Sequence, residues 1–332
     1  MLEIKVQSNT IQIGKNFSVS FQRTLRLPDD GKTYPLPPGL GNFPICKVDD
    51  YANSVPPSWK EHGGVFIPMY QREALWLNFT AAHWRPNAVK IAVGKINAVS
   101  GNPWVQKLQT RPQDYVVCPT QPWLDGINAG DDYIRQFVAM PLGMGYTVEA
   151  QVSGKEEFGG IQIIAFEPKP GKFPEKPPEY QEMERGISLS MAMPCAAPAG
   201  GMEMGIAAGG KMKQKIYPDS YGVDTWDESN YGRVYVHIVN SMMYREITGQ
   251  EPPNTPVSAK TYTQHGYPWF DLYDEHKGNL DASGILSDVK SVKEMDAEKG
   301  FSSQQDDTSI DVSPAQINKL PLDPNAIRDG KW

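Results

Sequence analysis

The chain has 332 residues, a net charge of −7 and three cysteines, so it can bury a sizeable core without disulfides. Its acidic balance does not favour nucleic acid or an anionic membrane surface as a partner. Cys46, Cys118 and Cys195 are odd in number and far apart, which argues against a disulfide framework or a structural zinc site. The first residues lack a signal-peptide pattern, and no apolar run reaches the roughly 18 residues of a membrane-spanning helix. We therefore expect a soluble cytoplasmic protein without a cofactor.

Residues 1–167 predict a series of short strands separated by turns. Prolines and glycines number 29 and 30 and fall between short alternating runs. This pattern indicates an antiparallel β-sandwich or jelly-roll domain, so the predicted fold class is mainly β. The predicted strands are residues 17–27, 64–70, 74–79, 88–93, 115–118, 134–140, 146–152 and 161–166, the last two forming a hairpin.

Two proline-rich segments interrupt this series. Residues 27–57 predict a long ordered surface loop, and loops of that length are usually functional or cover something. Residues 168–183 predict a linker, because five prolines lie between Pro168 and Pro178 and favour an extended, semi-rigid spacer.

The chain beyond this linker is predicted in two parts. Residues 184–275 form a smaller mixed α/β region, with a short helix capped by Asn240 or Ser241 and followed by Gly249. Residues 276–332 form an extended polar C-terminal arm with too few apolar residues to fold alone. An arm of this kind needs a surface to lie against, and we expect a neighbouring copy of the chain to supply it.

The sequence GIAAGGKM at residues 205–212 matches the phosphate-binding pattern G-x-x-x-x-G-K-[ST] except at Met212. The residues that follow alternate like a strand, so the helix that a phosphate site requires is missing. We expect instead a flexible glycine-rich loop at a contact between chain segments or subunits. An aromatic cluster from residue 262 onward is predicted to dock as a plug. The residues assigned to the assembly contact are Gly205, Gly209, Gly210, Met212, Tyr267, Trp269 and Phe270.

A soft-metal site is an alternative use of the same region. Cys195, Met202 and Met204 supply the thiolate and thioether ligands that select Cu(I). Methionine also fills gaps in apolar cores, and this second interpretation is favoured.

Aromatic side chains offer a third interpretation. Trp76, Trp84, Trp104 and Trp123 fall within the predicted sandwich, where such rings either fill the core or bind sugars and proteins. The carboxylates near predicted strand ends are Glu73, Asp125, Asp131 and Asp132, but their separations in space do not follow from the sequence. A carbohydrate-binding protein or carbohydrate-active hydrolase therefore stays open. Because no nucleophile motif occurs, we favour a protein that is not an enzyme.

Three segments resemble a family of uncharacterised, soluble bacterial proteins. They are GGVFIPMYQREALWLNF, QPWLDGINAGDDYIRQFVAMPLGMGYTVEAQVSG and VSAKTYTQHGYPWFDLYDE, and the resemblance runs from about residue 17 to residue 275. It implies no activity, ligand or catalytic residue. The sequence as a whole favours a self-assembling structural or binding protein whose partners are other copies of itself. It favours neither nucleic acid nor membrane as a partner, and leaves a carbohydrate or small-molecule ligand open.

Overall fold

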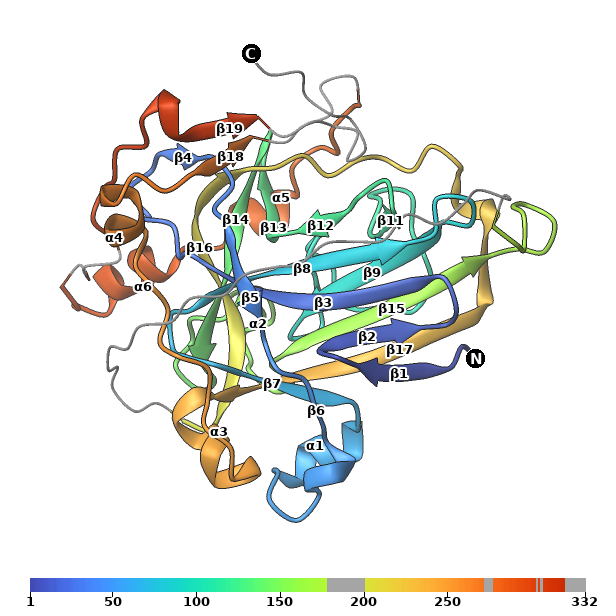
Figure 1. Ribbon diagram of the computed structural model, residues 1–332, viewed down its shortest axis with the longest axis horizontal. Coiled ribbons are helices and arrows are strands. Elements are labelled where there is room, and N and C mark those ends of the chain that lie inside the picture. Colours follow the sequence, from blue (N-terminus) through green and yellow to red (C-terminus); the bar gives the residue numbers. More distant parts are fainter. Residues whose placement is uncertain (178–200, 272–276, 303, 305–306, 320–332) are drawn as a thin grey trace, which may run out of the picture.

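The computed structural model describes residues 1–177, 201–271, 277–302, 304 and 307–319. The chain is mainly antiparallel β, with one hydrogen-bonded network of 17 strands and a separate pair, β18 and β19 (Figure 1). The strands are β1 Ile4–Gln7, β2 Thr10–Ile13, β3 Phe17–Thr24, β4 Thr33–Tyr34, β5 Gly39–Asn42, β6 Cys46–Lys47, β7 Val65–Met69, β8 Ala74–Ala81, β9 Asn87–Val93, β10 Ile96–Asn97, β11 Val116–Cys118, β12 Trp123–Leu124, β13 Gly126–Gly130, β14 Tyr133–Pro141, β15 Ile161–Pro168, β16 Glu203–Lys213, β17 Trp226–Asn240, β18 Trp269–Asp271 and β19 Ile317–Lys319.

The helices are short and lie around this network (Figure 1). They are α1 Pro57–His62, α2 Val148–Ser153, α3 Ser241–Thr248, α4 Ala259–Gln264, α5 Gly284–Ser287 and α6 Val292–Glu298, with 3-10 turns at Asp49–Tyr51, Val223–Thr225 and Pro314–Gln316. The predicted caps of α3 are confirmed, because the Asn240 side chain accepts the Met242 N–H and Gly249 takes the left-handed conformation that ends the helix. Within the described residues, no helix is long and apolar enough to cross a membrane.

The strands of the large network fall into two layers. The order β1, β2, β3, β8, β14, β16 makes one layer, and β7, β17, β15, β9, β11 makes the other. The layers join where Met204 of β16 pairs with Ile238 of β17, and again beside β1, where the Leu2 N–H donates to the Tyr231 carbonyl of β17 at 2.8 Å. Side chains from both layers, such as Leu77 and Ile163, belong to one buried core. The predicted β-sandwich class is confirmed.

One predicted strand is wrong. Residues 146–152 form helix α2 and not the first half of a hairpin. Thr147 caps this helix by accepting the Ala150 N–H, and Gly154 ends it at φ 76°. Buried Glu149 accepts the backbone N–H groups of Glu157, Phe158 and Gly159, which fixes the next turn. These caps outweigh the alternating pattern. Each of the other strands predicted within residues 1–167 corresponds to a strand of the structure.

The sequence predicted a loop for the glycine-rich residues 205–212, and this prediction is wrong. These residues form the centre of strand β16. The strand pairs with β14 along most of its length. The glycines allow close approach, since a Cβ on Gly209 would lie 2.6 Å from Val138 and one on Gly210 would lie 2.4 Å from the Pro28 carbonyl oxygen. Gly205, Gly209, Gly210 and Met212 are all buried against their own chain.

Strands before and after the proline-rich segment belong to the same network. β14 pairs with β16, and β15 pairs with β17, so residues on both sides of this segment contribute to one core. Residues 178–183 of the predicted linker lie outside the described residues.

The described part of the C-terminal arm lies against its own chain. Leu286 and Val292 have no exposed surface and fill apolar gaps in the body. A buried ion pair joins Arg26 to Asp307 at 2.7 Å, and a partly buried one joins Arg72 to Asp296. The arm is therefore bound to its own body over residues 277–302 and 307–319, with residues 320–332 outside the described chain.

Candidate ligand-binding site

A row of polar side chains runs along the outer face of strands β3 and β8. Side chains alternate between the two faces of a strand, so Phe17, Val19 and Phe21 enter the core while their neighbours point away from it. Strand pairing places these outer residues opposite one another. The pairs are Ser18 with Thr80, Ser20 with Asn78, and Gln22 with Trp76. The row thus carries hydroxyl and amide groups and ends at an indole ring.

An aromatic pocket of about 220 Å³ lies at the Trp76 end of this row. Its walls come from four parts of the chain, namely the segment 36–39, strand β8, the β12 region and strand β18. Trp123 stands beside the row because it pairs with Asn78 of β8. The lining residues are Leu36, Pro37, Pro38, Gly39, Trp76, Trp123, Asp125 and Phe270.

The wall formed by Leu36 and Phe270 is fixed by backbone hydrogen bonds. The Leu36 N–H donates to the Phe270 carbonyl, and the Phe270 N–H donates to the Leu36 carbonyl, both at 2.9 Å. Trp269 is fully buried and packs against Tyr34, with ring centroids 6.4 Å apart. In Figure 1, β18 and β19 lie beside β4 at one end of the molecule. The aromatic cluster predicted as a plug therefore docks on its own chain and holds Phe270 at the pocket.

Asp125 is the buried acid of the pocket, with 4% of its surface exposed. Its Oδ2 accepts a hydrogen bond of 2.9 Å from the Gln214 amide, and the Trp123 side chain also hydrogen-bonds to the carboxyl. Burial raises the pKa of Asp125 to about 8, more than these hydrogen bonds lower it. The carboxyl is therefore largely protonated at neutral pH and both donates and accepts hydrogen bonds.

The indole nitrogen of Trp76 is the second polar group of interest. The atom is buried, and it has no hydrogen-bond partner among the described residues. A buried donor without a partner costs free energy, and this makes the nitrogen a group that a ligand oxygen would satisfy if the ring shifts to expose it. Together with the Trp76, Trp123 and Phe270 rings, this arrangement fits an uncharged ligand that has an apolar face and several hydroxyl groups.

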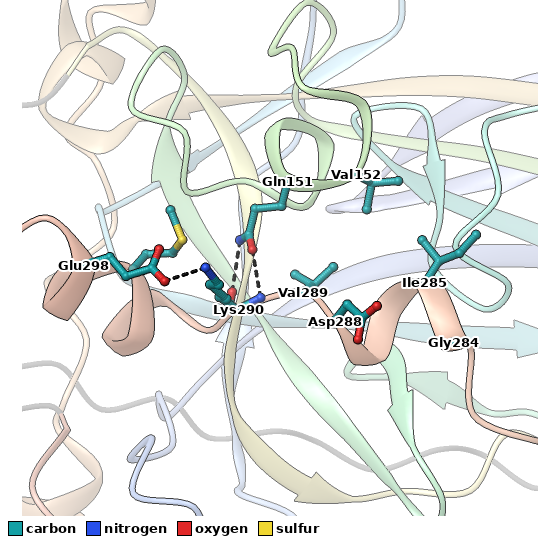
Figure 2. A pocket seen from close by; sticks show the side chains of 9 residues that line it. Gln151, Val152, Gly284, Ile285, Asp288, Val289, Lys290 and Glu298 are labelled. Carbon is teal, nitrogen blue, oxygen red and sulfur yellow. Dashed lines mark hydrogen bonds and ion pairs between the residues drawn. The ribbon is translucent and has the colours of Figure 1, made fainter.

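A larger hollow of about 530 Å³ lies between α2 and the segment that carries α5 and α6 (Figure 2). The Gln151 amide donates to the Lys290 carbonyl at 3.0 Å and accepts from the Lys290 N–H at 2.8 Å. The Lys290 side chain forms an ion pair with Glu298. These polar groups satisfy one another and attach the C-terminal segment to α2, so this hollow is a weaker candidate than the aromatic pocket.

The residues predicted as a copper site do not gather in the described chain. Met204 is buried in the main core, whereas Met202 packs against a different cluster that contains Trp59 and Phe66. Cys195 lies outside the described residues. Across the part of the chain that the structure describes, no group of three or more His, Cys, Asp and Glu side chains could hold a metal ion. Copper binding stays a prediction.

The residues predicted at an assembly contact have different surroundings. Tyr267 is 52% exposed, Trp269 belongs to the core, and Phe270 lines the pocket. Sequence reasoning singled out Trp76, Trp123 and Asp125 one by one and expected the loop over 27–57 to cover something. It missed Phe270 as part of the same site, because no local pattern links it to strands so far away along the chain.

No protein-family model matches this chain, and neither a curated protein nor a solved structure matches it.

Proposed function

We propose that the protein binds carbohydrate, and that the aromatic pocket at the end of the β3–β8 row is its binding site. The observation that carries the proposal is the combination of three aromatic rings with buried Asp125 and the unpartnered indole N–H of Trp76. Sugar rings present apolar C–H faces that pack on indoles, and hydroxyl groups that exchange hydrogen bonds with a protonated carboxyl.

The charge of the pocket supports a neutral ligand. Among the described lining residues, Asp125 is the one ionisable side chain, and its carboxyl is largely protonated at neutral pH. An anionic ligand would find no lysine or arginine in this wall, and a cationic ligand would find no ionised carboxylate. An uncharged sugar needs neither.

Binding without hydrolysis is the better supported form of this function. Most glycoside hydrolases use two carboxyl groups that flank the bond to be cleaved. Asp125 is the single carboxyl among the described residues that line the pocket. The site therefore has a group for recognition and lacks a second one for acid and base chemistry.

Titration calorimetry with neutral sugars tests the proposal, using cello-, malto- and xylo-oligosaccharides and their monosaccharides. Loss of an aromatic stacking surface costs about 1 kcal/mol or more, so Trp76→Ala and Trp123→Ala should each weaken binding about fivefold or more. Tyr221→Ala is the control, because Tyr221 is exposed and packs against Phe173 and Trp226, which do not line the pocket. Absence of binding to every sugar, or equal binding by all variants, would refute the proposed function.

A further inference from the structure

A further hollow, of about 450 Å³, lies at the end of the β3–β8 row that is opposite the aromatic pocket. This hollow and the aromatic pocket are together called the two hollows. Ser18 and Thr80, the pair that ends the row there, both line it. Trp84 supplies an aromatic ring, and Lys15 and His83 supply polar groups at this end. The other lining residues are Gln7, Thr10, Gln12, Asn16, Phe17, Ala81 and Ala82.

Trp84 repeats the feature that distinguishes Trp76. Its indole nitrogen is buried and has no hydrogen-bond partner among the described residues. The two hollows thus each contain an indole ring with an unused donor, although Trp76 and Trp84 lie at opposite ends of the row.

The row between the hollows is polar, with Thr80 exposed at one end and Ser20 buried in the middle. Gln22 and Asn78 are half-buried, and each donates to the Ser20 hydroxyl, at 3.3 and 3.4 Å. From Trp76 to Thr80 the strand advances about 13 Å, at roughly 3.3 Å per residue. A single sugar ring is too short to cover this length, whereas a linear chain of several units is long enough.

We propose that the ligand is a linear oligosaccharide that occupies both hollows, with one unit on Trp76 and Trp123, a later unit on Trp84, and the intervening units along the polar row. This inference rests on the proposed carbohydrate-binding function. It adds that affinity depends on chain length and that the hollow at Trp84 is a distal subsite.

The test measures affinity against chain length for the cello-, malto- and xylo-oligosaccharide series. In the parent protein, affinity should rise about two- to tenfold once the chain is long enough to reach Trp84, and longer chains should add little. Trp84→Ala should remove this rise and leave the affinity for short chains unchanged. Trp76→Ala should weaken binding at every length.

Thr80→Ala is a second distal variant, because Thr80 is exposed and its replacement leaves the core intact. It should also reduce the gain from longer chains. Affinity that is measurable but independent of length, or a length dependence unchanged in both Trp84→Ala and Thr80→Ala, would overturn the distal subsite while leaving the proposed function intact. Absence of binding at all lengths would overturn both.

Discussion

At the scale of single residues, two buried ionisable groups give the folded state opposite responses to pH. Burial lowers the pKa of His237 to about 3, so this residue costs stability as the pH falls below its unfolded value of about 6.5. The neutral ring is stacked between Trp59 and Tyr235, with centroids 4.6 and 4.3 Å away. Asp125 acts in the other direction, because burial raises its pKa to about 8.

Asp125→Asn should change how stability depends on pH. Between an unfolded pKa of about 3.9 and the folded pKa of about 8, the folded state holds a proton that the unfolded chain releases. The free energy of unfolding therefore falls as the pH rises through this window, by at most about 1.4 kcal/mol per pH unit. The variant lacks this loss, so its stability relative to the parent should increase from pH 5 to pH 8. Urea denaturation of both proteins at several pH values measures this difference in the free energy of unfolding. A difference that stays constant from pH 5 to pH 8 would contradict the raised pKa of Asp125.

At the scale of elements, the C-terminal helix α6 is attached to the body by buried polar contacts. Arg72 and the Tyr146 hydroxyl both bond to Asp296, the hydroxyl at 2.8 Å. The nearby pair of Lys290 and Glu298, at the edge of the hollow in Figure 2, is about half exposed. One helix thus carries a buried and an exposed ion pair.

Asp296→Ala should destabilise the protein by about 3 kcal/mol, because the Arg72 guanidinium, whose side chain is 17% exposed, loses its main partner and keeps only the longer contact of 3.6 Å to Asp307. Glu298→Ala is the matched control on the same helix, and removal of an exposed pair should cost less than about 1 kcal/mol. Chemical denaturation gives the loss of stability for both variants, provided that the slope of the unfolding free energy against denaturant concentration is unchanged. Equal losses for the two variants would show that the buried contact does not fasten the helix.

Local patterns predicted the elements well where one signal dominated. The alternating strand residues and the caps at Asn240 and Gly249 are examples. The prediction failed for residues 146–152, where alternation concealed a helix whose own signals were Thr147 and Gly154. It failed again at residues 205–212, because glycine marks close strand packing as well as turns. The pocket itself required tertiary pairing, since Leu36 meets Phe270 only through the folded body.

At the scale of the whole molecule, the proposed binding site depends on segments that are far apart along the chain. The pocket wall includes residues 36–39 and Phe270, which are separated by more than 200 residues of sequence. Self-association, predicted from the polar arm, stays a prediction, and its motivating segment contacts its own chain over residues 277–302 and 307–319. Light scattering of the intact protein tests self-association, because a particle of 36.9 kDa would exclude a stable assembly.

The central claim is that sugar enters the aromatic pocket, and filling that pocket tests it most directly. A Cβ on Gly39 would lie 3.4 Å from the Trp76 ring, an ordinary contact distance, and Gly39 itself is exposed. Gly39→Leu should therefore cover the ring while every lining side chain is retained. Calorimetry should show sugar binding by the parent and a loss of at least about tenfold in the variant, with both equally stable. Unchanged affinity in Gly39→Leu would contradict the account.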